Sequence, residues 1–332
     1  MIGFVILFVI LVFFLQQWIL DHSPDAVDAN FWPEDNVVDP DESFNIVIEL
    51  KNKERFPLYF IRVQSLFANE FQVKDNKFSF STWLKAKQKL QFKVPVSITK
   101  RGRYILKNPL LFFGDFLGLR EKRRELSLFR EVVVAPREYQ TEDVTQVLGK
   151  FLGEYSVRRF IFEDPVLTLG FREYSGREPM KMISWKQSAQ RQTLMVKEYD
   201  HTIEPVLSVL VNVETLSENA SEQIEKTFSI ARSVCSNLES KGISYDVYTN
   251  ASLAGGDSFS ITEGLGSRHF SKVMELLGRS MQHSAFSYEK LLKLARETGG
   301  RERGLVIITP DDTVISNSAS DSQTLFLNAT SL

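Results

Sequence analysis

Two groups of polar residues have the chemistry to hold a hard cation. Glu214 and Ser217 follow an apolar run that ends at Val213, and Asp311 follows a second apolar run. Ligands of open α/β sheets bind beyond the carboxyl ends of the strands, and carboxylate and hydroxyl oxygens are ligands of Mg²⁺. Glu214, Ser217 and Asp311 are therefore the candidate metal ligands. The simpler interpretation is that these side chains form turns and helix caps, so we expect no bound metal and no cofactor.

The sequence lacks the motifs of the common catalytic centres. It contains no phosphate-binding glycine loop, no His-Glu-x-x-His zinc motif and no Gly-x-Ser-x-Gly nucleophile turn. The single cysteine, Cys235, lies among apolar residues at helical spacing, which predicts a buried packing residue. The histidines are too far apart to share one helical turn: His22, His201, His269 and His283. We therefore expect no enzyme activity, although a carboxylate-based hydrolase near Arg172 stays open as the less favoured alternative.

Length and charge exclude several classes of protein. The chain has 332 residues, which suggests two domains at roughly 150 residues each. Its 40 basic and 42 acidic residues give a formal net charge of −2, so no global positive field attracts nucleic acid. Hydrophobic residues make up 43% and charged residues 25% of the chain, as in ordinary globular proteins. We expect no nucleic-acid partner.

Residues 1–20 contain no charged side chain and are apolar almost throughout. Twenty helical residues span about 30 Å, the thickness of the bilayer core, and Trp18 lies where an interfacial aromatic residue is expected. A cleaved signal peptide is the alternative, but the segment has no basic start and no clear small-residue cleavage site. The sequence therefore predicts a transmembrane anchor at 1–20 in a single-pass membrane protein.

The charges after this segment do not orient it. Residues 21–50 contain nine acidic residues and no Lys or Arg, and Lys51 is the first basic side chain. The positive-inside rule counts Lys and Arg close to the span, so here it gives no direction. Residues 21–41 are predicted to be an acidic linker.

Residues 42–137 are predicted to form a β-sandwich-like domain. Apolar and polar residues alternate over 44–50 and 90–96, which is typical of strands with one buried face. The 26 Phe residues of the chain suit a two-sheet core. Further strands are expected at 58–67, 78–84, 104–106, 110–113 and 128–134. The basic cluster at 120–124 is either a contact for an acidic partner or lipid phosphates or, as we favour, a solvated hairpin tip.

Residues 202–332 are predicted to form an α/β domain, connected through a region at 138–201. Continuous apolar runs indicate buried parallel strands, and apolar residues at helical spacing indicate helices between them. The strands are expected at 205–213, 243–248, 305–308 and 323–327. The helices are expected at 221–238, 270–277 and 288–298, after a short helix or linker at 141–151. The fold class is thus α+β multidomain, with an N-terminal transmembrane helix before the β and α/β domains.

Two segments of the chain resemble a bacterial family called domain of unknown function 58. The first begins with an Arg-Gly-x-Tyr strand at Arg101 and ends with an Asp-x-x-Gly-Leu turn at Leu119. The second has an arginine, a tyrosine and a glycine, followed at fixed spacing by Ile-x-Trp-x-x-Ser-Ala. Its matching residues are Arg172, Tyr174, Gly176, Ile183, Trp185, Ser188 and Ala189. The order of membrane segment, β domain, motif and α/β domain is also similar over nearly the whole chain.

The resemblance implies a membrane-anchored adaptor or assembly protein. Members are often paired with MoxR-type AAA+ ATPases, and their C-terminal part is similar to a von Willebrand factor A domain. Such a domain normally places Asp-x-Ser-x-Ser after its first strand to hold a divalent cation, whereas this chain has Asn212 in place of the aspartate. Arg177 likewise replaces the family's aspartate after Gly176. The pairing with a cytosolic ATPase implies a cytoplasmic body.

The motif has two physical interpretations. Its arginine offers a planar fork to a carboxylate or to carbonyl groups, its aromatic residues supply large surfaces with polar tips, and its glycine and proline suit a turn. It forms either a joint between the domains, which we favour, or a binding groove. The candidate residues for this partner or inter-domain contact are Arg172, Tyr174, Gly176, Pro179, Trp185 and Ser188. We expect a non-catalytic adaptor or scaffold; the alternative is a divalent-cation-dependent ligand-binding module.

Overall fold

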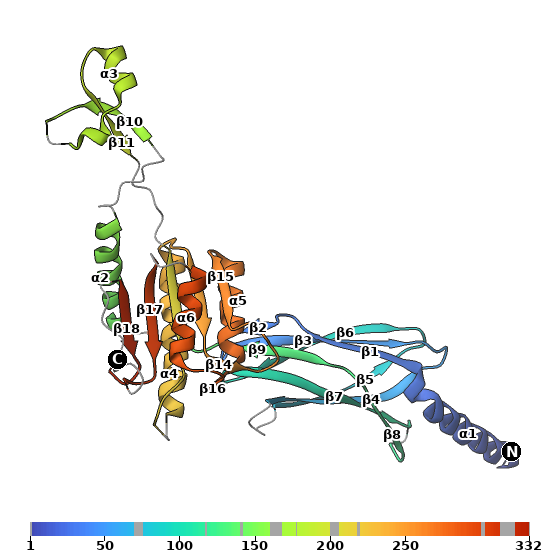
Figure 1. The fold of residues 1–332 in the computed structure, drawn as a ribbon. Helices are drawn as coiled ribbons and strands as arrows, with labels where there is room; N and C mark the ends of the chain where they lie inside the picture. Colours follow the sequence, from blue (N-terminus) through green and yellow to red (C-terminus); the bar gives the residue numbers. More distant parts are fainter. Residues whose placement is uncertain are drawn as a thin grey trace. The chain divides into compact units, whose positions relative to one another are not determined.

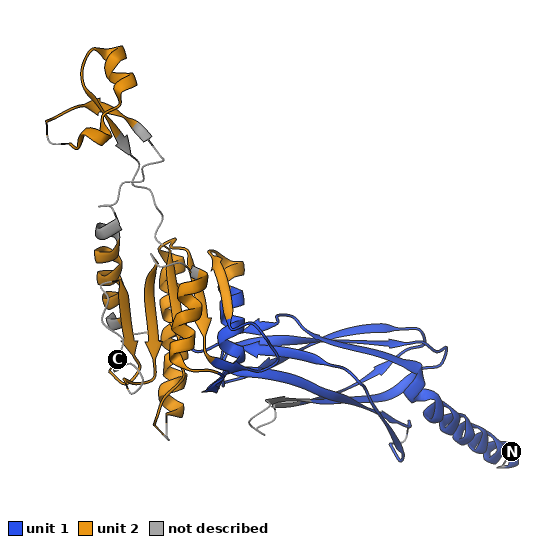
Figure 2. Cartoon of the chain, in the orientation of Figure 1, with its two compact units in different colours: residues 1–138, 251–259, 271–285 blue, residues 139–250, 260–270, 286–332 orange. Residues whose placement is uncertain are grey.

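The computed structural model has a mixed α/β fold with an N-terminal apolar helix and several sheets (Figure 1). It describes residues 2–69, 76–116, 118–139, 142–159, 168–176, 178–199, 206–217, 220–299, 303–312 and 323–331. The chain divides into two compact units (Figure 2). Unit 1 comprises Met1–Glu138, Ala251–Phe259 and Ser271–Ala285, and unit 2 comprises Tyr139–Asn250, Ser260–Phe270 and Phe286–Leu332.

Helix α1 (Ile2–Ala26) begins the chain and extends beyond the predicted anchor at 1–20. Leu, Ile, Phe and Val fill its first turns, and most of these side chains are exposed. Within Gly3–Ala26, a window of 18 residues has a mean hydropathy of 2.5, so the helix is long and apolar enough to span a membrane.

Residues 21–41 do not form the predicted acidic linker. Their first residues complete α1, and strand β1 (Val27–Pro33) follows directly. Val27 and Phe31 of β1 are fully buried, whereas Asp28 is exposed. Asp28 therefore lies on the outer face of a strand whose inner face is apolar.

Two sheets form the main part of unit 1. One has the strand order β1-β3-β6, and the other has the order β2-β9-β7-β4-β5, with β8 also paired to β7. The strands are β2 (Val37–Val38), β3 (Ser43–Asn52), β4 (Leu58–Asn69), β5 (Asn76–Leu84), β6 (Lys89–Ser97), β7 (Gly102–Gly114), β8 (Glu121–Glu125) and β9 (Arg130–Val134). β7 is a single strand where two short strands were predicted.

Buried side chains of the two sheets belong to one apolar core. Ile46 and Ile48 of β3 lie in the same cluster as Ile61 and Val63 of β4. The spacing of two residues in both strands places these side chains on one face of each sheet. The alternating apolar pattern in the sequence correctly predicted β3 and β6, and the strand expected at 58–67 corresponds to β4.

The basic cluster at 120–124 is not a hairpin tip, because most of it lies in strand β8. Lys122 forms an ion pair with Asp21 of α1 at 2.7 Å, and Arg124 donates to the carbonyl oxygen of Val27 at 2.8 Å. These long side chains reach partners on α1 and β1, which sequence spacing does not reveal.

Two segments from the predicted α/β domain lie in unit 1. They contain β14 (Ala251–Leu253), β16 (Ser280–Ser284) and the end of α5 (Ser267–Arg279). Arg279 and Arg103 both bind the carboxylate of Glu131, at 2.5 and 2.6 Å. Partial burial raises the pKa of Glu131, but these two guanidinium groups outweigh it and the pKa lies below its usual value. The network ties the end of α5 to the sheet that contains β7 and β9.

Unit 2 contains a five-stranded sheet of order β15-β13-β12-β17-β18. Its parallel strands are β12 (Leu207–Val211), β13 (Tyr245–Thr249), β17 (Gly304–Thr309) and β18 (Thr324–Asn328), and β15 (Ser260–Gly264) runs antiparallel to β13. Every residue of β12, β13 and β17 is buried. The continuous apolar runs in the sequence correctly predicted these parallel strands.

Helices α2 (Glu142–Arg159), α4 (Ser221–Ser240) and α6 (Tyr288–Gly299) belong to the same unit. Leu291 of α6 shares an apolar cluster with Leu210 of β12. The predicted burial of Cys235 in α4 is confirmed, and this burial raises the pKa of its thiol.

We predict that Gly278→Ala destabilises unit 1. An added Cβ would lie 2.8 Å from the carbonyl oxygen of Val134, so α5 or β9 would have to shift. We expect a loss of about 1–3 kcal/mol in the free energy of unfolding, measured by urea denaturation. The matched control is Gly153→Ala in α2, where nothing lies within 4 Å of the new Cβ. It should gain about 0.5–1 kcal/mol from helix propensity; equal effects at both sites would contradict the prediction.

Candidate functional site

The carboxyl edge of the unit 2 sheet is closed by two buried amides. Asn212 follows β12 and Asn250 follows β13, and both are fully buried. The Asn250 amide donates to Oδ1 of Asn212 at 2.7 Å, and the Asn212 amide donates to the hydroxyl of Thr309 at 3.3 Å. The Asn250 side chain also accepts from the Val213 amide at 2.9 Å. Each polar atom therefore has a partner inside the protein, as burial requires.

The three candidate metal ligands lie around these amides and are engaged in other contacts. Glu214 Oε2 accepts from the Tyr288 amide at 2.5 Å, and Asp311 accepts from the hydroxyl of Thr215. Ser217 is exposed, and its amide donates to the Thr215 hydroxyl at 3.0 Å. No group of three His, Cys, Asp or Glu side chains in the described part of the chain is placed to hold a metal ion.

A turn forms at this edge, but Asn212 makes it and not the three candidate ligands. Asn212 Oδ1 accepts from the Glu214 amide two residues later at 3.0 Å, which is an Asx turn. Helix α4 has Ala220 as its N-cap, without a side-chain hydrogen bond, so Ser217 does not cap it. Asn250 was not predicted as a member of this edge. Its position directly after a buried strand was the available signal.

We predict that Asn212→Asp lowers the free energy of unfolding by about 2–4 kcal/mol at pH 7, because it buries a charge and removes two hydrogen-bond donors. Burial raises the folded-state pKa of the new carboxyl above its unfolded value of about 3.9. The part of the penalty that comes from the buried charge should therefore vanish below about pH 4 and grow as the pH rises through the folded-state pKa, while the part from the lost donors persists. Asn36→Asp, at an exposed position, is the control and should change stability by less than about 0.5 kcal/mol. Urea unfolding across this pH range measures both variants.

The family motif forms a small hairpin with one short helix. Strands β10 (Thr168–Glu173) and β11 (Met195–Tyr199) are antiparallel, and a 3₁₀ turn (Met180–Met182) and helix α3 (Trp185–Arg191) connect them. Ile183, Met195 and Val196 form its buried side. We call residues 168–199 the motif hairpin; Arg177 lies outside the described residues.

An ion pair organises the turn after β10. Arg172 contacts Glu178 at 2.6 Å, and the hydroxyl of Ser175 donates to the same carboxylate at 2.7 Å. The hydrogen bond from the Ser175 hydroxyl is the largest of the effects that lower the pKa of Glu178 to about 2. Partial burial opposes this decrease, and the contact with Arg172 adds to it. A general acid requires a raised carboxyl pKa, so Glu178 is not suited to that role.

The other motif residues shape the backbone of the hairpin. Gly176 has φ of +88°, which suits glycine, and Pro179 precedes the 3₁₀ turn at φ of −60°. Ser188 donates to the carbonyl of Ser184 and accepts from the amide of Met195, both at 2.8 Å. Ser188 therefore joins α3 to β11. Whether the motif residues also make an inter-domain contact stays a prediction.

Several apolar side chains of the motif hairpin are exposed. Met180 is 70% exposed and Trp185 is 63% exposed, and Phe171 and Leu194 are also exposed. Tyr174 is half-buried, and its amide donates to the carbonyl of Leu194 at 2.8 Å. Trp185 is thus the first residue of a helix that Ser188 holds to β11, and most of its side chain is exposed.

A buried carboxylate lies at the end of the unit 2 sheet opposite to Asn212 and Asn250. Asp246 of β13 is 2% exposed, pairs with Arg303 at 2.8 Å and accepts from the hydroxyl of Tyr248 at 3.0 Å. Burial raises the pKa of Asp246, although Tyr248 and Arg303 oppose the increase. Arg303 also binds Glu263 of β15 at 2.6 Å, so the cluster joins β13, β15 and β17 at their ends.

We predict that Ser175→Ala raises the pKa of Glu178 from about 2 toward its usual 4.5. Because the pKa is depressed in the folded state, the ionised carboxylate stabilises the turn above about pH 4.5, and this stabilisation is lost as the pH falls through about 2. Titration of the Glu178 carboxyl carbon by NMR measures the change. Gln190→Ala, at an exposed position on α3, should leave that pKa unchanged. A wild-type midpoint near 4.5 would show that the turn does not form as described.

No family model and no curated protein sequence matches the chain. Among solved structures, it is similar to alkylpurine DNA glycosylase AlkC of Pseudomonas fluorescens, with 14% identity over 33% of this chain and 30% of that one, and a TM-score of 0.25. The CARDB domain of the PF1109 protein from Pyrococcus furiosus is matched with 17% identity over 33% of this chain and 90% of that one, at a TM-score of 0.23. A β-glucosidase from Listeria innocua shows 11% identity over 32% of this chain and 16% of that one, at 0.22. TM-scores this low carry no argument about fold or function.

Proposed function

We propose that the chain is a single-pass, membrane-anchored adaptor or scaffold protein without catalytic activity. The observation that carries the proposal is the exposure of large apolar side chains on the motif hairpin, where Met180 and Trp185 lie on a backbone held by hydrogen bonds. Exposed apolar patches mark interaction sites, and Trp and Met are enriched in the centres of protein interfaces. A large side chain held in place before binding loses little conformational entropy when a partner covers it.

The packing of α1 supports an anchor that is not cleaved. Leu20 and Ala26 belong to the apolar core of unit 1, and Ser23 is 3% exposed. Removal of this segment with a signal peptide would leave a cavity in the core. The preceding turns expose Phe8 and Leu11, whose side chains need an apolar environment.

The proposed partner is a MoxR-type AAA+ ATPase, as the resemblance to the family called domain of unknown function 58 implies. The soluble body would then lie in the cytoplasm. We further propose that the two sheets of unit 1 form a sandwich-like domain and that unit 2 carries a von Willebrand factor A-like domain. Its buried parallel strands support that assignment. The neutral pair Asn212 and Asn250 at its carboxyl edge favours the adaptor over a divalent-cation-dependent ligand-binding module.

The test is co-purification from native membranes under mild detergent. The wild-type chain should bring down the AAA+ ATPase, and Trp185→Ala should reduce its recovery about tenfold or more, because buried aromatic anchors dominate interface energies. Gln190→Ala, on the same short helix, is the matched control and should retain the partner. Recovery of the ATPase with Trp185→Ala at the wild-type level would assign binding to another surface. Absence of any ATPase from the wild-type sample would overturn the proposed partner.

A further inference from the structure

A group of exposed apolar side chains lies beside the last turns of α1, far from the motif hairpin in sequence. Phe116 and Leu119, in the turn between β7 and β8, are 65% and 76% exposed. Tyr59 of β4 is 46% exposed and packs edge-on against Phe116, with ring centroids 5.5 Å apart. A tight turn made of polar residues would avoid this exposure, so the patch needs an explanation.

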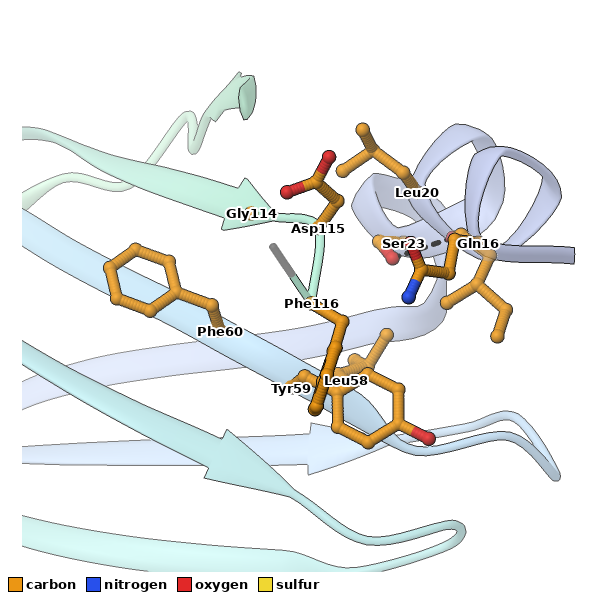
Figure 3. Close-up of a pocket in the computed structure, with 10 residues that line it drawn as sticks. Gln16, Leu20, Ser23, Leu58, Tyr59, Phe60, Gly114, Asp115 and Phe116 are labelled. Carbon is orange, nitrogen blue, oxygen red and sulfur yellow. Dashed lines mark hydrogen bonds between the residues drawn. The ribbon is translucent and has the colours of Figure 1, made fainter. Parts of the chain in front are cut away.

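Contacts with α1 hold the patch at a fixed position along the helix axis. Asp115 and Phe116 line a shallow pocket together with Gln16, Leu20 and Ser23 of the helix (Figure 3). The turn itself is closed by hydrogen bonds, since the Leu119 amide donates to the Asp115 carboxylate at 2.8 Å.

Contacts of charged side chains fix the turn at the same position along the axis of α1. Arg120 donates to the side chain of Gln17 at 2.9 Å, and Lys122 pairs with Asp21 at 2.7 Å. All these contacts lie within unit 1, so the turn and the helix are parts of one body.

The chemistry of α1 locates the bilayer surface at this level. Asp21 is the first charged side chain of the chain, and it follows an uncharged stretch that ends at Leu20. Trp18 is 50% exposed, as expected for an aromatic residue in the interfacial layer. If α1 spans the membrane as proposed above, the hydrocarbon boundary lies near Trp18 to Asp21. The turn, which contacts Gln17 through Arg120, must then meet the lipid.

We propose that the β7–β8 turn is a second membrane-contacting element, which inserts Phe116 and Leu119 into the interfacial layer of a phospholipid bilayer. Tyr59 extends this apolar surface, and the exposed Arg120 and Arg123 are placed to reach lipid phosphates. The proposal rests on the proposed membrane anchoring by α1. It gives the anchor a function beyond attachment, because two contact points restrict the tilt of unit 1 on the membrane where a single helix leaves it free to swing.

The experiment uses the full chain reconstituted into phosphatidylethanolamine and phosphatidylglycerol vesicles. Cys235 is buried and its thiol pKa is raised, so it contributes little background labelling. A single new cysteine at Leu119→Cys then carries a polarity-sensitive fluorophore. Quenching by lipids brominated on their acyl chains reports contact with the membrane.

Two reference positions calibrate the signal. Phe8→Cys, on an exposed face of α1, reports whether the helix itself lies in lipid. Thr99→Cys lies just after β6, at the end of the sheet away from α1. At that end Ser97 pairs with Ser43, whereas at the end nearer α1 Lys89 pairs with Lys51. We expect the label at Leu119→Cys to be quenched nearly as strongly as at Phe8→Cys and several-fold more than at Thr99→Cys.

A second variant tests the mechanism of insertion. Phe116→Asp places a charge beside the label, and quenching at Leu119→Cys should fall to the level of Thr99→Cys. Strong quenching that persists in this variant would contradict insertion of the turn.

The outcomes separate the two proposals. Quenching at Phe8→Cys without quenching at Leu119→Cys would overturn the membrane contact of the turn and leave the anchor in place. It would mean that water or another protein covers the patch. Quenching at neither position would overturn both the anchor and the turn contact. Quenching at Leu119→Cys alone would support the turn as a membrane-binding surface and overturn the spanning helix.

Discussion

Helix α1 ends inside the core of unit 1 while its earlier turns are exposed, and much of unit 1 depends on this constraint. Leu20 and Ala26 fill the core between the two sheets, while Trp18 and the residues before it face outward. A helix that ends inside a core cannot rotate or slide independently of it, because movement would open cavities and break hydrogen bonds such as that from the Lys53 amide to the Ala26 carbonyl. Packing therefore fixes the position of each nearby loop along the axis of α1.

Two groups of buried or partly buried polar side chains form closed networks. At the carboxyl edge of the unit 2 sheet, Asn212 and Asn250 satisfy each other, and in unit 1 Glu131 is bound by two arginines. Such networks stabilise a fold because an unpaired polar group is costly when buried. Exposed apolar side chains lie elsewhere, on the motif hairpin and beside α1.

The parts of the fold that sequence reasoning predicted well are those with a simple local pattern. Continuous apolar runs identified β12 and β17, and helical spacing identified α4 and the burial of Cys235. Acidic composition concealed β1, since Asp28 and its neighbours suggested a linker although Val27 and Phe31 are buried. In the motif hairpin, the matching residues were recognised, but the partners Ser175 and Glu178 were missed because their contacts follow from the turn geometry.

Local pattern alone was sufficient to indicate an apolar helix that can span a membrane, strands with one buried face, and the lack of common catalytic motifs, because periodicity reports which side of an element is apolar. The three-dimensional arrangement was needed to place residues 251–259 and 271–285 in unit 1, to close the carboxyl edge with two amides, and to bring the β7–β8 turn beside Gln16 and Gln17 of α1. Lys122 and Asp21 are about 100 residues apart in the chain, and their ion pair exists only because α1 and β8 pack against the same sheets. Such long-range contacts are fixed by the packing of whole elements, which leaves no mark in the spacing of neighbouring residues.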